Sequence, residues 1–176
     1  MRNTAFLVLG VLLLVLQSNL FRLLDLLPFS VAMPSLLLPL VLFMGVHEYS
    51  VGRGAALAFL LGYLLDVFSA APVGLFTFLS VVTFVVARAA GVRLAAQTIL
   101  TKIALAFAFA LVEGVLVVVL TAIFGGEVAR PRALAVLVPE YAVATAATAP
   151  LVMALAERVH LATMALPAPG EGTGRA

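Results

Sequence analysis

Three carboxylic acids lie inside long apolar stretches of this chain, and they are the residues best placed to do chemistry. They are Asp66, Glu113 and Glu140. A charged side chain at the centre of a bilayer costs roughly 2.5–3.5 kcal/mol on insertion scales. An acid kept in such a stretch can hold a proton, an ion or the polar end of a solute, or it can accept hydrogen bonds from backbone amides.

The neighbours of Asp66 favour a structural role over a site for a substrate or an ion. Gly62 precedes it by one helical turn and Ser69 follows almost one turn later, so the three share a helix face. Gly54 and Ala58 extend that face as a stripe of small residues, which lets helix backbones approach closely in lipid. We predict that Asp66 caps the start of the next helix, because a carboxylate is favoured near helix N-terminal amides.

Glu113 lies near the middle of the fifth apolar segment, beside a second small-residue stripe formed by Ala106, Ala110 and Gly114. A proton relay normally needs ionisable groups through the full depth of the membrane. The fourth apolar segment offers none between its ends. A helix-packing or partner-binding role is therefore favoured for Glu113 over transport.

Glu140 follows Pro139 in the outer half of the sixth apolar segment. The fifth and sixth segments are sequential and antiparallel, so Glu140 and Glu113 could converge on one pocket. Both acids can be protonated or paired with a base. The candidate bases are Lys102, Arg130 and Arg132.

Other chemical motifs are missing from the sequence. There is no cysteine, and His47 and His160 are far apart without an H-E-x-x-H pattern. No G-x-S-x-G elbow or glycine-rich phosphate loop occurs, and Asp25 and Asp66 are the only aspartates. We predict no enzyme activity, no catalytic residues, no metal site and no cofactor.

The composition determines the class of protein that must position these acids. The 176 residues are 65% hydrophobic and 10% charged, with a mean hydropathy of +1.26. Soluble domains average about 45–50% apolar and about 25% charged residues. We predict an all-α, polytopic integral membrane protein with a single domain over residues 1–165. The net charge of +2 is scattered along the chain, so nucleic acid is not expected as a partner.

Six apolar segments are candidates for crossing the bilayer, which takes about 20 residues as a helix. Pro28, Pro34 and Pro39 interrupt the second, so it is either a kinked span or a loop followed by a short helix. Pro72 is well placed to start the fourth segment. We predict a disordered cytoplasmic tail over residues 166–176. The six segments are residues 4–24, 26–46, 53–68, 72–90, 97–124 and 133–160.

Basic residues indicate the orientation, because Lys and Arg favour cytoplasmic loops. Six spans with both termini in the cytoplasm place seven of the ten basic residues inside. These seven are Arg2, Arg53, Arg88, Arg93, Lys102, Arg158 and Arg175. The three left outside are Arg22, Arg130 and Arg132.

The third and fourth segments carry a recognisable pattern: a Gly-x-x-x-Asp helix end, a short turn, and a glycine that opens the next helix. Here these are Gly62, Asp66 and Gly74, within residues 54–75. This pattern resembles the signature of the bacterial rod shape-determining MreD family. The proline-interrupted run at residues 34–39 and the almost loop-free plan of the whole chain are similar to that family too.

The resemblance implies a non-enzymatic, multi-pass subunit of the elongasome (the Rod complex) in the bacterial inner membrane. Such a subunit binds MreC and, indirectly, MreB, RodA and its partner transpeptidase, to maintain rod shape and direct lateral peptidoglycan synthesis. It also implies a fold similar to the six-helix substrate-binding subunits of energy-coupling-factor transporters. Self-association stays open.

Two functions follow as alternatives. In the first, the transmembrane helix of MreC docks on the face formed by Gly54, Ala58, Gly62, Asp66, Ser69, Pro72 and Gly74. In the second, the chain is a small-solute-binding membrane subunit of a transporter, with Glu113, Glu140 and the turn between the third and fourth segments lining a pocket.

Overall fold

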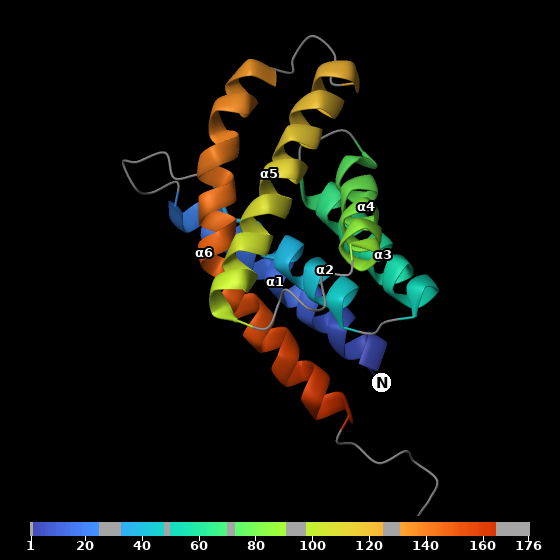
Figure 1. The fold of residues 1–176 in the computed structure, drawn as a ribbon. Coiled ribbons are helices and arrows are strands. Elements are labelled where there is room, and N and C mark those ends of the chain that lie inside the picture. The colour runs from blue at the N-terminus through green and yellow to red at the C-terminus, as the bar shows by residue number, and fades with distance from the viewer. Residues whose placement is uncertain are drawn as a thin grey trace, which may run out of the picture.

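The structure, a computed structural model, describes residues 2–24, 33–47, 50–69, 73–90, 98–124 and 131–164. These residues form six helices and no strand, as the all-α prediction requires (Figure 1). The helices are α1 (Arg2–Leu24), α2 (Leu37–Val46), α3 (Val51–Phe68), α4 (Leu75–Ala89), α5 (Ile99–Phe124) and α6 (Pro131–Met164).

Four of these helices are long and apolar enough to cross a membrane. They are α1, α3, α5 and α6, whereas α2 and α4 are apolar but shorter, with 10 and 15 residues. At about 1.5 Å per residue, α4 is roughly 22 Å long, compared with about 30 Å for the hydrocarbon core of a bilayer. Each helix falls on one of the six predicted segments, so the predicted elements are present while four meet the length of a span.

Helix α2 lies inside the bundle, and all ten of its residues are buried. Its length of about 15 Å is half of the hydrocarbon thickness. Pro39 occupies the first turn, where a missing backbone N–H breaks no intrahelical hydrogen bond. Of the two alternatives left open for this region, residues 33–47 take the second: a non-helical stretch followed by a short helix.

The start of α2 is held by hydrogen bonds to the helices beside it. The Leu36 amide donates to Gln17 Oε1 of α1 at 3.1 Å, and the Ser35 amide donates to Thr145 Oγ1 of α6 at 3.0 Å. The Ser35 hydroxyl accepts from the Leu38 amide at 3.2 Å. Because buried backbone amides need partners, these polar side chains fix where the extended stretch enters the bundle.

Helices α5 and α6 run side by side as a long hairpin (Figure 1). The predicted stripe of Ala106, Ala110 and Gly114 is buried. A Cβ at Gly114 would lie 2.7 Å from Val138 Cγ1, so glycine permits the close approach of α6. With 34 residues, α6 is roughly 51 Å long and exceeds the thickness of the hydrocarbon core.

One cluster of buried apolar side chains receives residues from all six helices, with α2 at its centre. Large apolar side chains also remain exposed on the outer faces of the long helices. Examples are Leu12, Val67, Val119 and Val143. Such an outer surface suits a lipid environment, because hydrocarbon solvates it and water does not.

Several predictions fall on residues outside those that the structure describes. They are the position of Pro72, the disordered tail at 166–176, and the residues Arg93, Arg130 and Arg175. The sides of the membrane assigned to all ten basic residues stay predictions.

Candidate functional site

The carboxylate of Asp66 is buried and accepts hydrogen bonds from the start of α4. Its Oδ2 accepts from the Gly74 amide at 3.0 Å and the Thr77 amide at 2.9 Å, and Oδ1 accepts from the Phe76 amide at 2.8 Å. The Thr77 hydroxyl donates to Oδ2 as well. The first amides of a helix have no intrahelical acceptor, so Asp66 supplies it from a neighbouring helix. The predicted capping role is confirmed.

The two glycines around this cap have conformational reasons to be there. Gly74 has φ of +97°, in the left-handed region that side chains disfavour. A Cβ at Gly62 would lie 2.7 Å from both the Phe76 carbonyl oxygen and the Thr77 Cα, which are backbone atoms. Gly62, Asp66 and Gly74 therefore build one joint between α3 and α4.

Two further residues of the small-residue face, Gly54 and Ala58, also pack within the chain. Ala58 is fully buried, and a Cβ at Gly54 would overlap the ring of Phe84 in α4. The Ser69 hydroxyl donates to the Asp66 carbonyl at 3.2 Å and ends the face. Because α4 packs against Gly54, Gly62 and Asp66, this part of the predicted face is a packing face. Pro72 lies outside the described residues, and docking of the MreC helix stays a prediction.

Glu113 is buried in α5, with 7% of its surface exposed. The Tyr141 hydroxyl of α6 donates to its Oε2 at 2.7 Å. Among the residues that the structure describes, Oε1 receives no hydrogen bond. This carboxyl group therefore keeps an acceptor free, whereas both oxygens of Asp66 are engaged.

A cavity of about 610 Å³ opens beside Glu113. It is formed where α1 and α3 end, where α4 and α6 begin, and along the second half of α5, and Met33 and Ser35 close it before α2. Its wall is mostly apolar, and the described lining contains no Lys, Arg or His. The polar side chains that line it are Gln17, Ser18, Ser35, Ser69, Glu113 and Tyr141.

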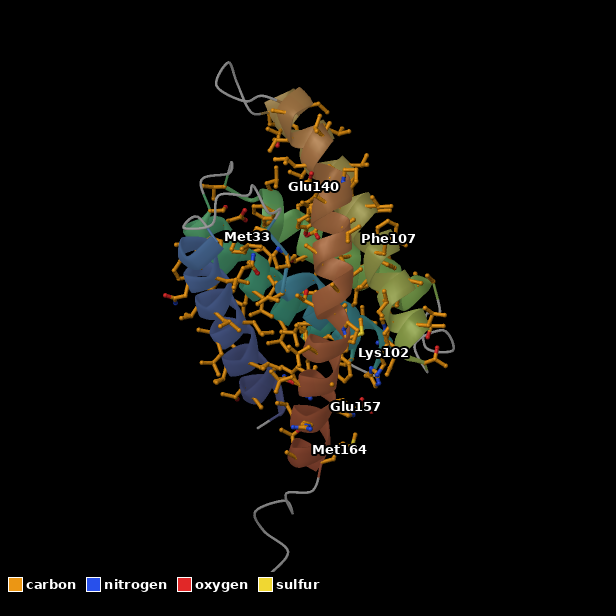
Figure 2. The ribbon with its side chains drawn as sticks, turned by 90° about the vertical axis from the view of Figure 1, so that its left-hand side faces the viewer. Met33, Lys102, Phe107, Glu140, Glu157 and Met164 are labelled. Carbon is orange, nitrogen blue, oxygen red and sulfur yellow. The ribbon has the colours of Figure 1, made fainter. Side chains whose placement is uncertain are left out.

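Glu140 does not join this site, which corrects the expectation that it converges with Glu113. It is exposed and absent from the cavity wall, and Figure 2 shows it in the upper part of α6. Successive helical residues point about 100° apart, so the side chain that reaches Glu113 is Tyr141. Nor does Lys102 pair with either acid, since its Nζ lies 3.6 Å from Glu157 Oε2.

Comparison with protein-family models, with curated proteins and with solved structures finds no match for this chain. The resemblance to the MreD family therefore rests on the residues of the α3–α4 joint and on the general plan of the chain.

Sequence reasoning missed Tyr141, Ser35 and Gln17 as members of the site. Each is a polar residue inside or beside an apolar segment, and that was the available signal. What the sequence did not contain is their register, because they come from three separate elements whose packing brings them to one cavity.

The two histidines, far apart in sequence, meet at the opposite end of the bundle. Their ring centroids are 6.0 Å apart, and the ring of Phe43 stacks on His47 at 4.0 Å. Burial lowers the pKa of His47, and the nearby charge of His160 lowers it further. The hydrogen bond to the Phe43 carbonyl acts in the opposite direction and raises this pKa. Within the described ranges, no three His, Cys, Asp or Glu side chains gather closely enough to hold a metal ion.

Proposed function

We propose that this chain is a non-enzymatic inner-membrane subunit of the elongasome, of the MreD type, that binds the transmembrane helix of MreC. In this role it helps to maintain rod shape and to direct lateral peptidoglycan synthesis alongside MreB, RodA and its partner transpeptidase. Its six helices would be arranged as in the substrate-binding subunits of energy-coupling-factor transporters, with both termini in the cytoplasm.

The observation that supports the proposal is the α3–α4 joint. Of the three residues that carry the family resemblance, Asp66 accepts a hydrogen bond from the Gly74 amide at 3.0 Å, and Gly62 packs against the backbone of Phe76 and Thr77, just after Gly74. Their spacing thus belongs to one structural unit rather than to three unrelated positions. A family signature of this kind marks a fold, and the role in the elongasome is what the family resemblance adds to it.

A partner helix would bind on an outer surface, since α4 fills the small-residue face of α3. In lipid, such association depends on side-chain packing and interhelical hydrogen bonds rather than on hydrophobic drive. The exposed side of α3 offers Phe59, Tyr63 and Val67. The outer side of α5 offers Val112 and Val119.

The test is co-purification in mild detergent with the MreC encoded in the same genome, followed by native mass spectrometry. A defined complex is expected. The chain has no cysteine, so single cysteines can map the interface by disulfide trapping against a cysteine in the MreC helix. We expect crosslinks from one outer face, for example Tyr63→Cys, and none from the buried Ala58→Cys. Absence of any complex, with both proteins folded, would count against the proposal.

A second candidate, a small-solute-binding membrane subunit of a transporter, is favoured by the cavity beside Glu113. Pockets that bind small molecules are concave and mostly apolar, with a few converging polar groups. A purified protein that carries a discrete bound solute and does not bind MreC would favour the solute-binding role over the MreC-binding role.

A further inference from the structure

We propose that the cavity beside Glu113 binds a small organic cation: a mostly apolar molecule with one protonated amine that pairs with the carboxyl group of Glu113. This inference rests on the cavity and on the carboxyl group of Glu113 in its wall. It holds whether the chain serves MreC or a transporter, and its test does not involve MreC.

The size and wall of the cavity suit such a molecule. Its volume of about 610 Å³ lies within the range of about 300–1,000 Å³ that is usual for small-molecule pockets. Apolar side chains from α1, α5 and α6 make most of the wall, including Leu14, Val118 and Leu137. An apolar body therefore gains most by entering, and only one end of the ligand meets polar groups.

The charge of the cavity selects the polar end. Glu113 carries the only carboxyl group in the described lining, and no basic side chain accompanies it there. A buried carboxylate without a cation is costly, because the apolar surroundings replace water. A bound ammonium group removes that cost, whereas a carboxylate or phosphate ligand would place a second negative charge beside the first.

The carboxyl group of Glu113 is held by a hydrogen bond from Tyr141 before any ligand arrives. Tyr141 donates to Oε2, which leaves Oε1 as the acceptor without a donor among the described residues. Gly114, next in α5, lets α6 approach closely and so keeps Tyr141 within reach. Pre-organised groups bind more tightly because less order is lost on binding.

The test uses three probes with one apolar body and different charges: 1-aminoadamantane, 1-adamantanol and adamantane-1-carboxylate. The full chain is placed in phosphatidylcholine nanodiscs, whose zwitterionic lipid does not select for charge. Binding of radiolabelled 1-aminoadamantane is measured by equilibrium dialysis, empty nanodiscs are subtracted, and the other two compounds compete.

The ammonium compound is expected to bind most tightly, the alcohol more weakly, and the carboxylate not at all. Glu113→Gln should weaken the ammonium compound about tenfold or more, since hydrogen bonds to charged groups are the strong ones. Glu140→Gln, the matched change at an exposed acid outside the cavity, should leave binding unaltered. Val118→Phe, which fills the cavity, should weaken the binding of the ammonium compound and of the alcohol to a similar extent.

Equal binding of the carboxylate and ammonium compounds would overturn the proposal, as would unchanged binding in Glu113→Gln or no binding of any probe. If Glu113→Gln does not fold, the order of the three probes on the unaltered chain decides. A chain that binds MreC and no probe would keep the proposed function and reject this site. A chain that binds the ammonium compound and not MreC would support this site and count against the proposed function.

Discussion

Asp66 and Glu113 are both buried carboxyl groups in the middle of an apolar chain, yet they do different work. The carboxylate of Asp66 accepts four hydrogen bonds from the start of α4. Glu113 accepts one, from Tyr141, and borders a cavity. Both oxygens of Asp66 are engaged in hydrogen bonds within the fold, whereas Glu113 keeps an oxygen that can accept a hydrogen bond from a ligand.

This difference shows how buried acids in membrane helices can be sorted. Burial alone does not separate them, since both are more than nine-tenths buried. The number of donors aimed at each oxygen does, together with the space beside it. An acid whose donors are backbone amides of another helix joins two elements, and its loss breaks that joint.

The largest expected effect is that of Asp66→Ala. Four donors, three of them backbone amides, would lose their acceptor inside the protein. Buried unsatisfied groups cost about 1–3 kcal/mol each, so we expect a loss of at least ~4 kcal/mol in the free energy of unfolding. Unfolding in mixtures of mild detergent and SDS measures it. The free energy of unfolding of Asp66→Asn, which keeps one acceptor oxygen, should lie between those of Asp66→Ala and the unaltered chain. An Asp66→Ala variant as stable as the unaltered chain would contradict the structural role given to Asp66.

Gly62→Ala should be the next largest. The added Cβ would lie 2.7 Å from two backbone atoms of α4, so the α3–α4 joint must open. Overpacking of this kind costs about 1–3 kcal/mol. Gly52→Ala is the matched control in the same helix, because nothing lies within 4 Å of its new Cβ. Thermal unfolding of both variants should show a loss for Gly62→Ala alone, and equal losses would reject the role of close packing.

Glu113→Gln should change stability far less than Asp66→Ala does. The amide oxygen of Gln still accepts from Tyr141, so the free energy of unfolding should change by less than about 1 kcal/mol. The same unfolding assay serves as the readout. A loss as large as that of Asp66→Ala would mean that Glu113, too, is consumed by the fold.

The smallest expected effect is a pH dependence of stability caused by His47, at the far end of the bundle. Burial is the main cause of the change in the pKa of this side chain. Its pKa in the folded protein is lowered, chiefly by burial, below the value of about 6.5 for an unfolded chain. The unfolded state therefore takes up the proton first as pH falls. His47 contributes no pH dependence well above pH ~6.5, and stability should decline as pH drops below it.

Unfolding at pH 7.5 and 5.5 checks this sign. His47→Phe keeps an aromatic ring to stack on Phe43 and removes the titration, so its loss of stability on acidification should be smaller. A variant with the same pH dependence as the unaltered chain would show that other groups cause it.

Much of the fold could be predicted from hydrophobic patterning. All six helices fall on predicted apolar segments, and four of them have the length and composition of a helix that crosses a bilayer. The capping role of Asp66 was predictable as well, since its donors come from the next helix after a short turn. Local sequence contains both partners of such a contact.

The short buried α2 could be narrowed to two alternatives and no further. Pro34 and Pro39 disfavour one continuous helix, but they do not say whether the remaining segment lies at the surface or in the core. Its position depends on hydrogen bonds to the side chains of Gln17 in α1 and Thr145 in α6, which accept from the backbone amides before α2. Long-range hydrogen bonds of this kind have no signature in the segment itself.

By itself, then, the sequence determined the class of protein, its helices and the joint at Gly62, Asp66 and Gly74, because each depends on composition or on residues close in the chain. Only the tertiary structure decided that α4 covers the small-residue face, that Tyr141 rather than Glu140 meets Glu113, and that a cavity opens there. Those outcomes depend on how six helices rotate against one another. A rotation of one residue, about 100°, exchanges a buried side chain for an exposed one while leaving the apolar pattern of the segment almost unchanged.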